Sequence, residues 1–143
     1  MFRRILYPYD FSGVSRKSVD YIKKLREAGT DEVIVLHVVD SRACKTLFYD
    51  TDRSLKAETE LFRKASKDIR PVVEELQAAG FIVRVRIETA IPSQEILRIE
   101  EEEKPSLIVM GSHGKSNIEE MLLGSVSEAV VRKASGPVLV IKR

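Results

Sequence analysis

Five short apolar runs are spaced along the chain, and they predict the strands of a sheet. They cover residues Ile5–Tyr7, Val33–Val39, Phe81–Ile87, Leu107–Met110 and Val138–Ile141. The second, fourth and fifth runs are almost continuously apolar, which is typical of strands covered on both faces. The third run alternates apolar and polar residues. We therefore expect it to lie near an edge of the sheet, with Arg84 and Arg86 facing water.

Between these runs, apolar residues recur at helical spacing. We predict helices from Ser12 to Gly29, from Leu55 to Gly80, from Pro92 to Glu103 and from Ser125 to Ala134. Gly29 suits a left-handed stop, and Pro71 is expected to kink or restart the second helix because proline lacks a backbone donor. Residues 40–55 are expected to be an irregular, mobile insertion. The glutamates at 100–103 are interpreted as a solvated helix end.

Strands and helices alternate along the chain, and this order predicts the fold class. Alternation of this kind is typical of a doubly wound α/β domain, with a parallel sheet, right-handed crossovers and helices on both faces. The 143 residues, of which 43% are hydrophobic, are expected to form one such domain over residues 1–143.

Composition excludes several classes of protein. The 24 basic and 22 acidic side chains are well mixed, so no basic surface for nucleic acid is expected. A single cysteine, Cys44, rules out an intrachain disulfide and favours a reducing compartment. Neither a signal peptide nor an apolar run of about 18 residues is present. We therefore expect a cytoplasmic protein that does not cross a membrane.

In an open parallel sheet, ligands bind beyond the carboxyl ends of the strands, where the winding direction reverses. The residues that follow the first, second and fourth predicted strands are therefore candidates for a site. They are residues 8–12, 37–40 and 111–114.

The last of these segments begins the glycine-rich stretch GSHGKS, which starts at Gly111. It matches neither the phosphate-binding loop of ATPases nor the dinucleotide pattern G-x-G-x-x-G. Nine residues separate Gly114 from Gly124, and Ser125 with Glu128 has the spacing of a capping box, which predicts a helix start. The N–H groups of a helix start attract anions. Two such bends could hold one phosphate chain, or be an ordinary turn and an ordinary cap.

The motif GSHG, nine residues, then GS resembles the G-x-x-G-x9-G-(S/T) signature of the universal stress protein family, in its ATP-binding branch. ILYPYDFSG resembles that family's opening strand and aspartate, VIVLHVVD its second strand, LIVMGSHG its fourth and GPVLVIKR its last. The similarity extends over the whole chain. It implies a five-stranded parallel sheet in the order 3-2-1-4-5.

The resemblance also implies a nucleotide site. Adenine and ribose would be lined by Pro8, Tyr9, Asp10 and Val38. Ribose and phosphates would be surrounded by Met110, Gly111, Ser112, His113, Gly114, Lys115, Gly124, Ser125, Val126 and Ser127. The implied ligand is ATP, or ADP or AMP, with Mg²⁺ or Mn²⁺ held by the phosphates rather than by a protein cage. Asp10 has an alternative role as a cap of the helix near Ser12. Tyr9 replaces a smaller residue that is frequent in the family, and would stack on the base or crowd it.

These residues support an ATP-binding regulatory protein, in which bound nucleotide orders the glycine loop and alters contacts with unidentified partner proteins. No catalytic residue is assigned. The alternatives are a slow ATP hydrolase or nucleotidyl-transferring enzyme that uses His113, and a structural dimer without a ligand. The apolar last strand, 138–141, is predicted to lie at an edge that invites pairing. The resemblance implies a homodimer through it.

Overall fold

The computed structural model describes residues 1–47, 51–114 and 123–143. Its strands are β1 (Arg4–Pro8), β2 (Glu32–Asp40), β3 (Ile82–Ala90), β4 (Leu107–Gly111) and β5 (Val138–Ile141). Its helices are α1 (Gly13–Leu25), α2 (Ser41–Leu47), α3 (Thr51–Asp68), α4 (Arg70–Ala78), α5 (Pro92–Glu103) and α6 (Ser125–Lys133). All five predicted strands are present.

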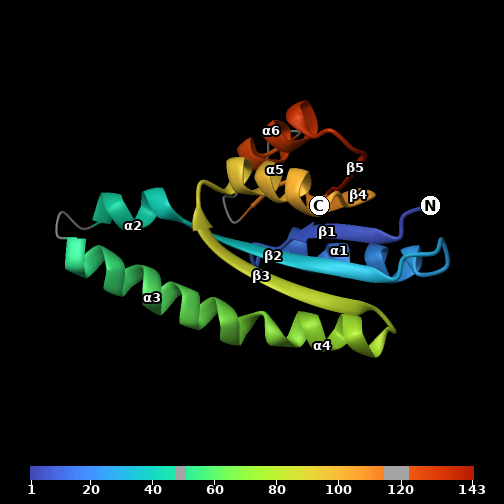
Figure 1. Ribbon diagram of the computed structural model, residues 1–143, viewed down its shortest axis with the longest axis horizontal. Coiled ribbons are helices and arrows are strands. Elements are labelled where there is room, and N and C mark those ends of the chain that lie inside the picture. The colour runs from blue at the N-terminus through green and yellow to red at the C-terminus, as the bar shows by residue number, and fades with distance from the viewer. Residues whose placement is uncertain (48–50, 115–122) are drawn as a thin grey trace.

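The strands form one parallel sheet in the order β3-β2-β1-β4-β5. Helices α5 and α6 cover one face, while α1, α3 and α4 cover the other (Figure 1). The predicted fold class and strand order are thus confirmed, and the winding direction reverses between β1 and β4.

Alternate residues of each central strand enter two separate cores, since successive side chains of a strand point to opposite faces. In β1, Ile5 and Tyr7 pack in the core beneath α1 and α4, whereas Leu6 packs in the core beneath α5 and α6. In β2, Val35 and Leu36 divide in the same way. Both faces are therefore buried, which explains the nearly continuous apolar pattern of β2.

Two predictions about the backbone are confirmed. Gly29 adopts a positive φ of 94° shortly after α1 ends. The long helical segment is divided near Pro71, because α3 ends at Asp68 and α4 begins at Arg70. The missing donor of proline is harmless in the first turn of a new helix.

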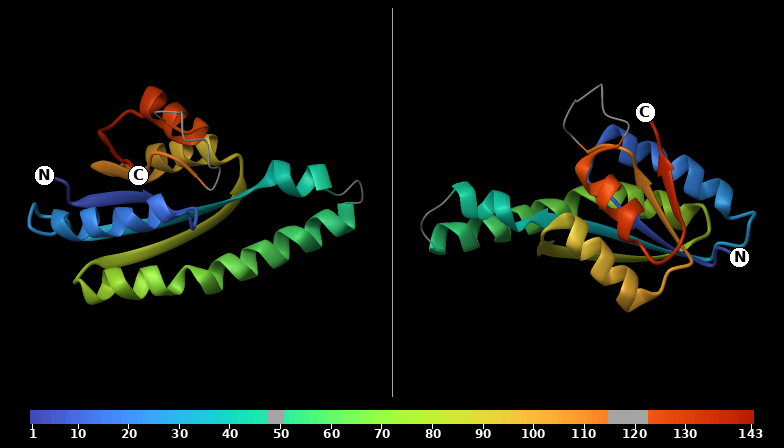
Figure 2. Two further views of the ribbon diagram at one scale, coloured as in Figure 1. Left: turned by 180° about the vertical axis from the view of Figure 1, so that it is seen from behind. Right: turned by 90° about the horizontal axis from the view of Figure 1, so that it is seen from above.

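The expectation of an irregular insertion at residues 40–55 is wrong. Helix α2 occupies Ser41–Leu47, and α3 already begins at Thr51. The backbone N–H of Arg42 donates to Oδ1 of Asp40 at the start of α2, and α2 packs on α3. Helix α2 and the N-terminal part of α3 project beyond the end of the sheet (Figures 1 and 2). Cys44 of α2 is 1% exposed, so the segment does contribute a buried side chain. Its apolar residues Ala43, Cys44 and Leu47 lie at helical spacing but form a run too short to have predicted a helix.

The acidic end of α5 is only partly solvated: Glu101 and Glu102 are exposed as expected, but Glu100 is not. Glu100 is only 5% exposed. Its Oε2 accepts a hydrogen bond from the backbone N–H of Ser135 at 3.1 Å, and its Oε1 from that of Gly136 at 2.8 Å. Glu100 therefore links α5 to the loop between α6 and β5.

The arginines of β3 do not simply face water either. Strand β3 is an edge strand, as predicted, but Arg84 and Arg86 both form ion pairs with Glu103 of α5. Hydrogen bonds from Arg84 hold the pKa of Glu103 below its usual value. Two positive charges thus offset the unfavourable position of acidic residues at a helix C-terminus.

Candidate nucleotide site

A cavity of about 300 Å³ lies where the winding direction of the sheet reverses. β1 and β4 pair only at Ile5 with Leu107 and at Leu6 with Ile108, although β1 continues to Pro8 and β4 to Gly111. The two strands therefore separate before their carboxyl ends, and the cavity occupies this opening.

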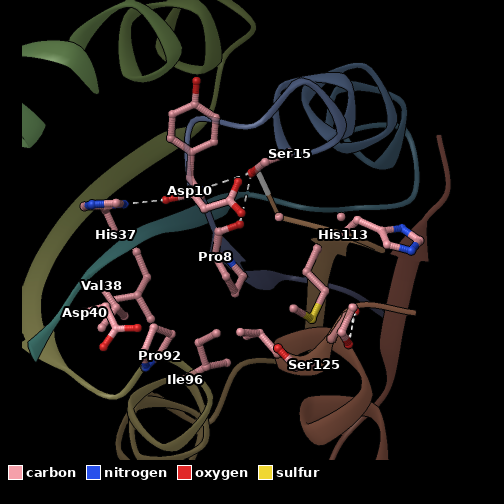
Figure 3. A pocket seen from close by; sticks show the side chains of 18 of the residues that line it. Pro8, Asp10, Ser15, His37, Val38, Asp40, Pro92, Ile96, His113 and Ser125 are labelled. Atoms are coloured by element: carbon pink, nitrogen blue, oxygen red, sulfur yellow. Dashed lines mark hydrogen bonds between the residues drawn. The ribbon is translucent and has the colours of Figure 1, made fainter. Parts of the chain in front are cut away.

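The floor of the cavity follows from the period of two along each strand. The side chains of Leu6, Leu36 and Ile108 face α5 and α6. The residue two positions beyond each of them therefore faces the same side and lines the cavity; these residues are Pro8, Val38 and Met110. One wall is formed by Pro92 and Ile96 of α5 (Figure 3). The start of α6 forms another wall, with Ser125 in its first turn.

Most of the predicted site residues line this one cavity. They are Pro8, Tyr9, Asp10, Val38, Met110, Gly111, His113, Gly114, Gly124, Ser125, Val126 and Ser127. Ser112 is 1% exposed and is not among the lining residues, but it joins the two glycine bends as described below. Lys115 lies outside the described residues.

The lining also contains residues that we did not assign from the sequence. They are Ser15, Leu36, His37, Asp40, Arg42, Pro92 and Ile96. The rule for carboxyl ends had already marked His37 and Asp40, and applied to the third strand it would have found Pro92. Arg42 lies in the segment that was expected to be irregular, so the sequence offered no signal for it.

The two glycine bends are in direct contact. The carbonyl of Ser112 accepts hydrogen bonds from the backbone N–H of Gly124 and from Oγ of Ser127, both at 2.6 Å. Oγ of Ser127 also lies 3.0 Å from the carbonyl oxygen of Gly124. Ser127 is 2% exposed, so its side chain is buried in this junction.

The capping box predicted at Ser125 and Glu128 is wrong, and the Ser112 junction stands at the start of α6 instead. The N-cap of α6 is Gly124, in an extended conformation, and no side-chain hydrogen bond caps the helix. Ser125 is the first helical residue and is exposed, while Glu128 pairs with Arg132. The chain enters α6 directly from its contact with Ser112. At this end of the helix, the serine that hydrogen-bonds to backbone carbonyls is therefore Ser127.

The start of α6 can attract an anion. The first N–H groups of a helix have no acceptor within the helix and carry a partial positive charge. Here they belong to Ser125, Val126 and Ser127, all of which line the cavity. A phosphate in the cavity would therefore meet backbone donors that the helix itself leaves unused.

The glycines allow the segments around the cavity to pack closely on one another. A Cβ at Gly111 would lie 2.9 Å from Cγ1 of Val14, and one at Gly124 would lie 3.2 Å from the carbonyl oxygen of Ser112. A Cβ at Gly114 would lie 3.0 Å from Oδ2 of Asp10. Close approach of these backbones to a phosphate stays a prediction, but contacts within the protein already require small residues here.

Asp10 belongs both to the cavity and to the turn before α1. Its Oδ1 accepts a hydrogen bond from the backbone N–H of Ser12 at 2.9 Å. The N-cap itself is Ser12, whose Oγ accepts from the backbone N–H of Ser15 at 3.1 Å. The alternative role of Asp10 is thus partly right, because it fixes the turn that carries the cap. Its Oδ2 lies on the side of Gly114.

The backbone beside Asp10 is strained. Phe11 has a φ of 64°, which is rare for a bulky residue. Its ring packs on Tyr9, with centroids 4.9 Å apart, and on His37, at 4.7 Å. Nδ1 of His37 is in turn 2.8 Å from the carbonyl oxygen of Tyr9. These contacts hold the turn in a conformation that directs Asp10 to the cavity (Figure 3).

The ring of Tyr9 faces away from the cavity floor. Tyr9 packs with Tyr7 in the core beneath α1 and α4, on the other face of the sheet. Burial raises the pKa of its hydroxyl above the usual value. Tyr9 borders the cavity, but its ring neither stacks over the floor nor crowds it. The pairing with β2 continues one residue past β1, since the N–H of Tyr9 donates to the carbonyl of Leu36, and the period of two turns Tyr9 to the same face as Ile5 and Tyr7.

His113 contacts its own loop, with Nδ1 2.8 Å from Oγ of Ser112.

Across the described ranges, no group of three or more His, Cys, Asp or Glu side chains could hold a metal ion. None of the helices in the described ranges has the length and apolarity to span a bilayer.

Comparison with known proteins agrees with this geometry. Residues 1–142 match the sequence model of the Universal stress protein family. The chain belongs to this family. It is 39% identical to Universal stress protein MJ0577 of Methanocaldococcus jannaschii, over 100% of this chain and 96% of that relative. The solved structure of the MJ0577 protein superposes with a TM-score of 0.93, covering 100% of this universal stress protein and 97% of that chain.

Two more distant structures share the universal stress protein fold. One is a universal stress protein in complex with cAMP, 22% identical, with a TM-score of 0.67 over 99% of this chain and 97% of that one. The other is a family member from Arabidopsis thaliana with AMP bound, 18% identical, with a TM-score of 0.70 over 98% and 91%.

Proposed function

We propose that this universal stress protein binds ATP, or ADP or AMP, in the cavity at the reversal point of the sheet. One observation carries the proposal: a single cavity joins an apolar floor to the unused backbone donors of α6. The base would lie on Val38 and Met110, and the phosphates would lie at the first turn of α6. Asp10, between these ends, can accept hydrogen bonds from ribose hydroxyls.

Size and energy are compatible with such a ligand. A volume of about 300 Å³ is at the lower end of the range for small-molecule pockets. Hydrogen bonds to charged groups contribute about 1.5–3 kcal/mol each, and micromolar affinity requires about 8 kcal/mol. Three such bonds supply about 4.5–9 kcal/mol before the cost of association, and burial of the base adds to this. The cAMP and AMP complexes among proteins of this fold favour an adenine nucleotide.

The proposed ligand brings its own cation. Mg²⁺ or Mn²⁺ would be held by phosphate oxygens, as is usual for Mg²⁺ in nucleotide sites. Asp10 lines the cavity beside Gly114, and its carboxylate is therefore the side-chain group best placed to approach this cation. We further propose that bound nucleotide orders the glycine loop and thereby changes contacts with partner proteins. The loop and α6 share the Ser112 junction, so phosphates bound there would stabilise both.

The site is tested by adding a charge at the start of α6. Ser125→Asp should keep or raise stability, because acidic residues favour a helix N-terminus. It should weaken ATP binding by roughly tenfold or more, since like charges a few ångströms apart repel by kcal/mol amounts. Calorimetric titration with ATP, AMP and adenosine measures this, and adenosine affinity should not change.

Ser125→Asn is the matched control, because asparagine has nearly the same shape as aspartate but carries no charge. Equal ATP affinity in the two variants would contradict the proposed position of the phosphates. The absence of binding in the unmodified protein would favour the ligand-free structural dimer. Phosphate release over many turnovers, lost in His113→Ala with binding intact, would favour the hydrolase.

We also infer that the protein forms a homodimer through β5. This strand is the outer neighbour of β4, and Val138, Leu139 and Val140 are only partly buried in the single chain. An edge strand with partly exposed apolar residues favours pairing with a second copy. Light scattering at micromolar concentration should give twice the chain mass. A monomeric mass would contradict the inference.

A further inference from the structure

Strand β3 offers a long backbone edge for pairing. It is the last strand on its side of the sheet, and it pairs with β2 along its whole length, from Ile82 to Ala90. Among the described residues, no strand pairs with its outer side. The N–H and C=O groups of such an edge are a template for a further strand. β3 is thus a second open edge, at the opposite side of the sheet from β5.

Apolar side chains on one face of this edge border a groove. Helix α4 lies alongside β3 (Figure 1). The groove between them has a volume of about 340 Å³, and its apolar lining consists of Ile69, Val73, Val85 and Ile87. Val85 is 41% exposed. Alternate side chains of a strand added to β3 would project on this face and pack along the groove, so the added strand would bury apolar surface as well as pair its backbone.

The charged side chains on the other face of β3 are held against α5. Nη1 of Arg86 lies 2.8 Å from Oε1 of Glu102 and 3.1 Å from Oε1 of Glu103. Nη2 of Arg86 lies 3.0 Å from Oε1 of Glu88, and Arg84 pairs with Glu103 at 2.6 Å. Charged side chains can protect an edge strand against pairing. Both arginines are turned toward α5 here, so they leave the edge accessible.

We infer that β3 pairs with β3 of a second copy of this chain, antiparallel and about a two-fold axis at Ile87. In this register Arg86 lies opposite Glu88 of the second copy, and symmetry forms the reverse pair as well. With the pair inside each chain, this gives a ring of four alternating charges. Registers centred on Val85, Arg86 or Glu88 would instead place like charges directly opposite one another, which is destabilising. The charges of the edge are therefore complementary to themselves in the register centred on Ile87.

This contact is independent of the contact proposed for β5. Because the two strands lie at opposite edges, pairing at both would join chains end to end in one continuous sheet. Light scattering from micromolar to millimolar concentration measures this assembly, without added nucleotide. The average mass should rise with concentration above twice the chain mass.

Glu88→Lys tests the charge pairs. It should weaken the association by about tenfold or more, because the lysine of each copy would lie opposite Arg86 of the other. Glu27→Lys is the matched control, since it makes the same change of charge at an exposed position beyond the end of α1. This variant should associate like the unmodified protein. Thermal unfolding of both variants shows whether the fold is retained.

Ile87→Cys tests the register without changing a charge. Opposite Cα atoms of antiparallel strands are about 4.5–5.5 Å apart, which is within the range of a disulfide. Oxidation with diamide should therefore convert Ile87→Cys to a covalent dimer. Val85→Cys is the control on the same face, and it should cross-link far more slowly, because Val85 lies opposite Thr89 in this register. Cys44 is 1% exposed and does not compete.

The outcomes separate this inference from the others. A mass that stops at twice the chain mass and is unchanged in Glu88→Lys would overturn it and leave β5 as the dimer contact. Equal rates of cross-linking in the two cysteine variants would also overturn it, because they would indicate random collision. Neither assay contains nucleotide, so a failure to bind ATP would leave this inference standing, and its own failure would leave the proposed function standing.

Discussion

Replacement of Gly111 by alanine is expected to destabilise the protein by about 1–3 kcal/mol, the usual cost of an added methyl group in a closely packed site. The new Cβ would lie 2.9 Å from Cγ1 of Val14 and 3.1 Å from the backbone nitrogen of Ser15. The second atom is main chain in the first turn of α1 and cannot rotate away. Denaturant unfolding measures the change.

The same substitution should also weaken nucleotide binding. The N–H of Ser15 donates to the N-cap Ser12, and the N–H of Ser12 donates to Asp10. If α1 moves away from β4, this chain of hydrogen bonds transmits the shift to the Asp10 side chain in the cavity. We therefore expect lower ATP affinity in Gly111→Ala even under conditions where the protein remains folded.

Gly13→Ala is the control for this experiment. A Cβ at Gly13 meets nothing within 4 Å, and Gly13 is the first residue of α1. Alanine there should leave stability unchanged or raise it by up to about 1 kcal/mol, because it restricts the unfolded chain. Equal unfolding midpoints for the two variants would contradict the close contact between β4 and α1.

The sequence was most informative where burial imposes a pattern. The apolar runs of β2 and β4 predicted strands buried on both faces, and alternation in β3 predicted an edge. The rule for carboxyl ends marked Asp10 and Gly111 as candidates, and the strand order that the family resemblance implied brought the two to one site. The order of the strands came from the family resemblance, since periodicity alone does not say which strand lies beside β1.

Polar partners brought together by tertiary structure were beyond the sequence. Nothing near Glu100 in the chain shows that Ser135 and Gly136 will donate to it, 35 and 36 residues away. The sequence does not distinguish a buried glutamate from a solvated one. Arg42 was missed for a related reason, because its hydrogen bonds to Asp40 depend on α2, and the short apolar run of Ala43, Cys44 and Leu47 did not predict that helix.

Replacement of Glu100 by alanine is the last large effect that we expect, a loss of about 2–5 kcal/mol in the free energy of unfolding. Two hydrogen bonds to a charged acceptor disappear, each contributing about 1.5–3 kcal/mol, and water offsets part of the loss because Ser135 and Gly136 are exposed. Glu101→Ala removes an exposed carboxylate from the next position of α5 and should change stability by less than about 0.5 kcal/mol.

The Glu100 variant also tests how the phosphate end of the cavity is positioned. Glu100 holds the loop that follows α6, and the first turn of α6 lines the cavity. If this anchor positions the helix, Glu100→Ala should weaken ATP binding but leave adenosine binding nearly unchanged, because the base is proposed to lie on Val38 and Met110, away from the loop that Glu100 holds. An equal loss for both ligands would mean that the whole site loosens. Unchanged stability would mean that the loop holds α6 without this carboxylate.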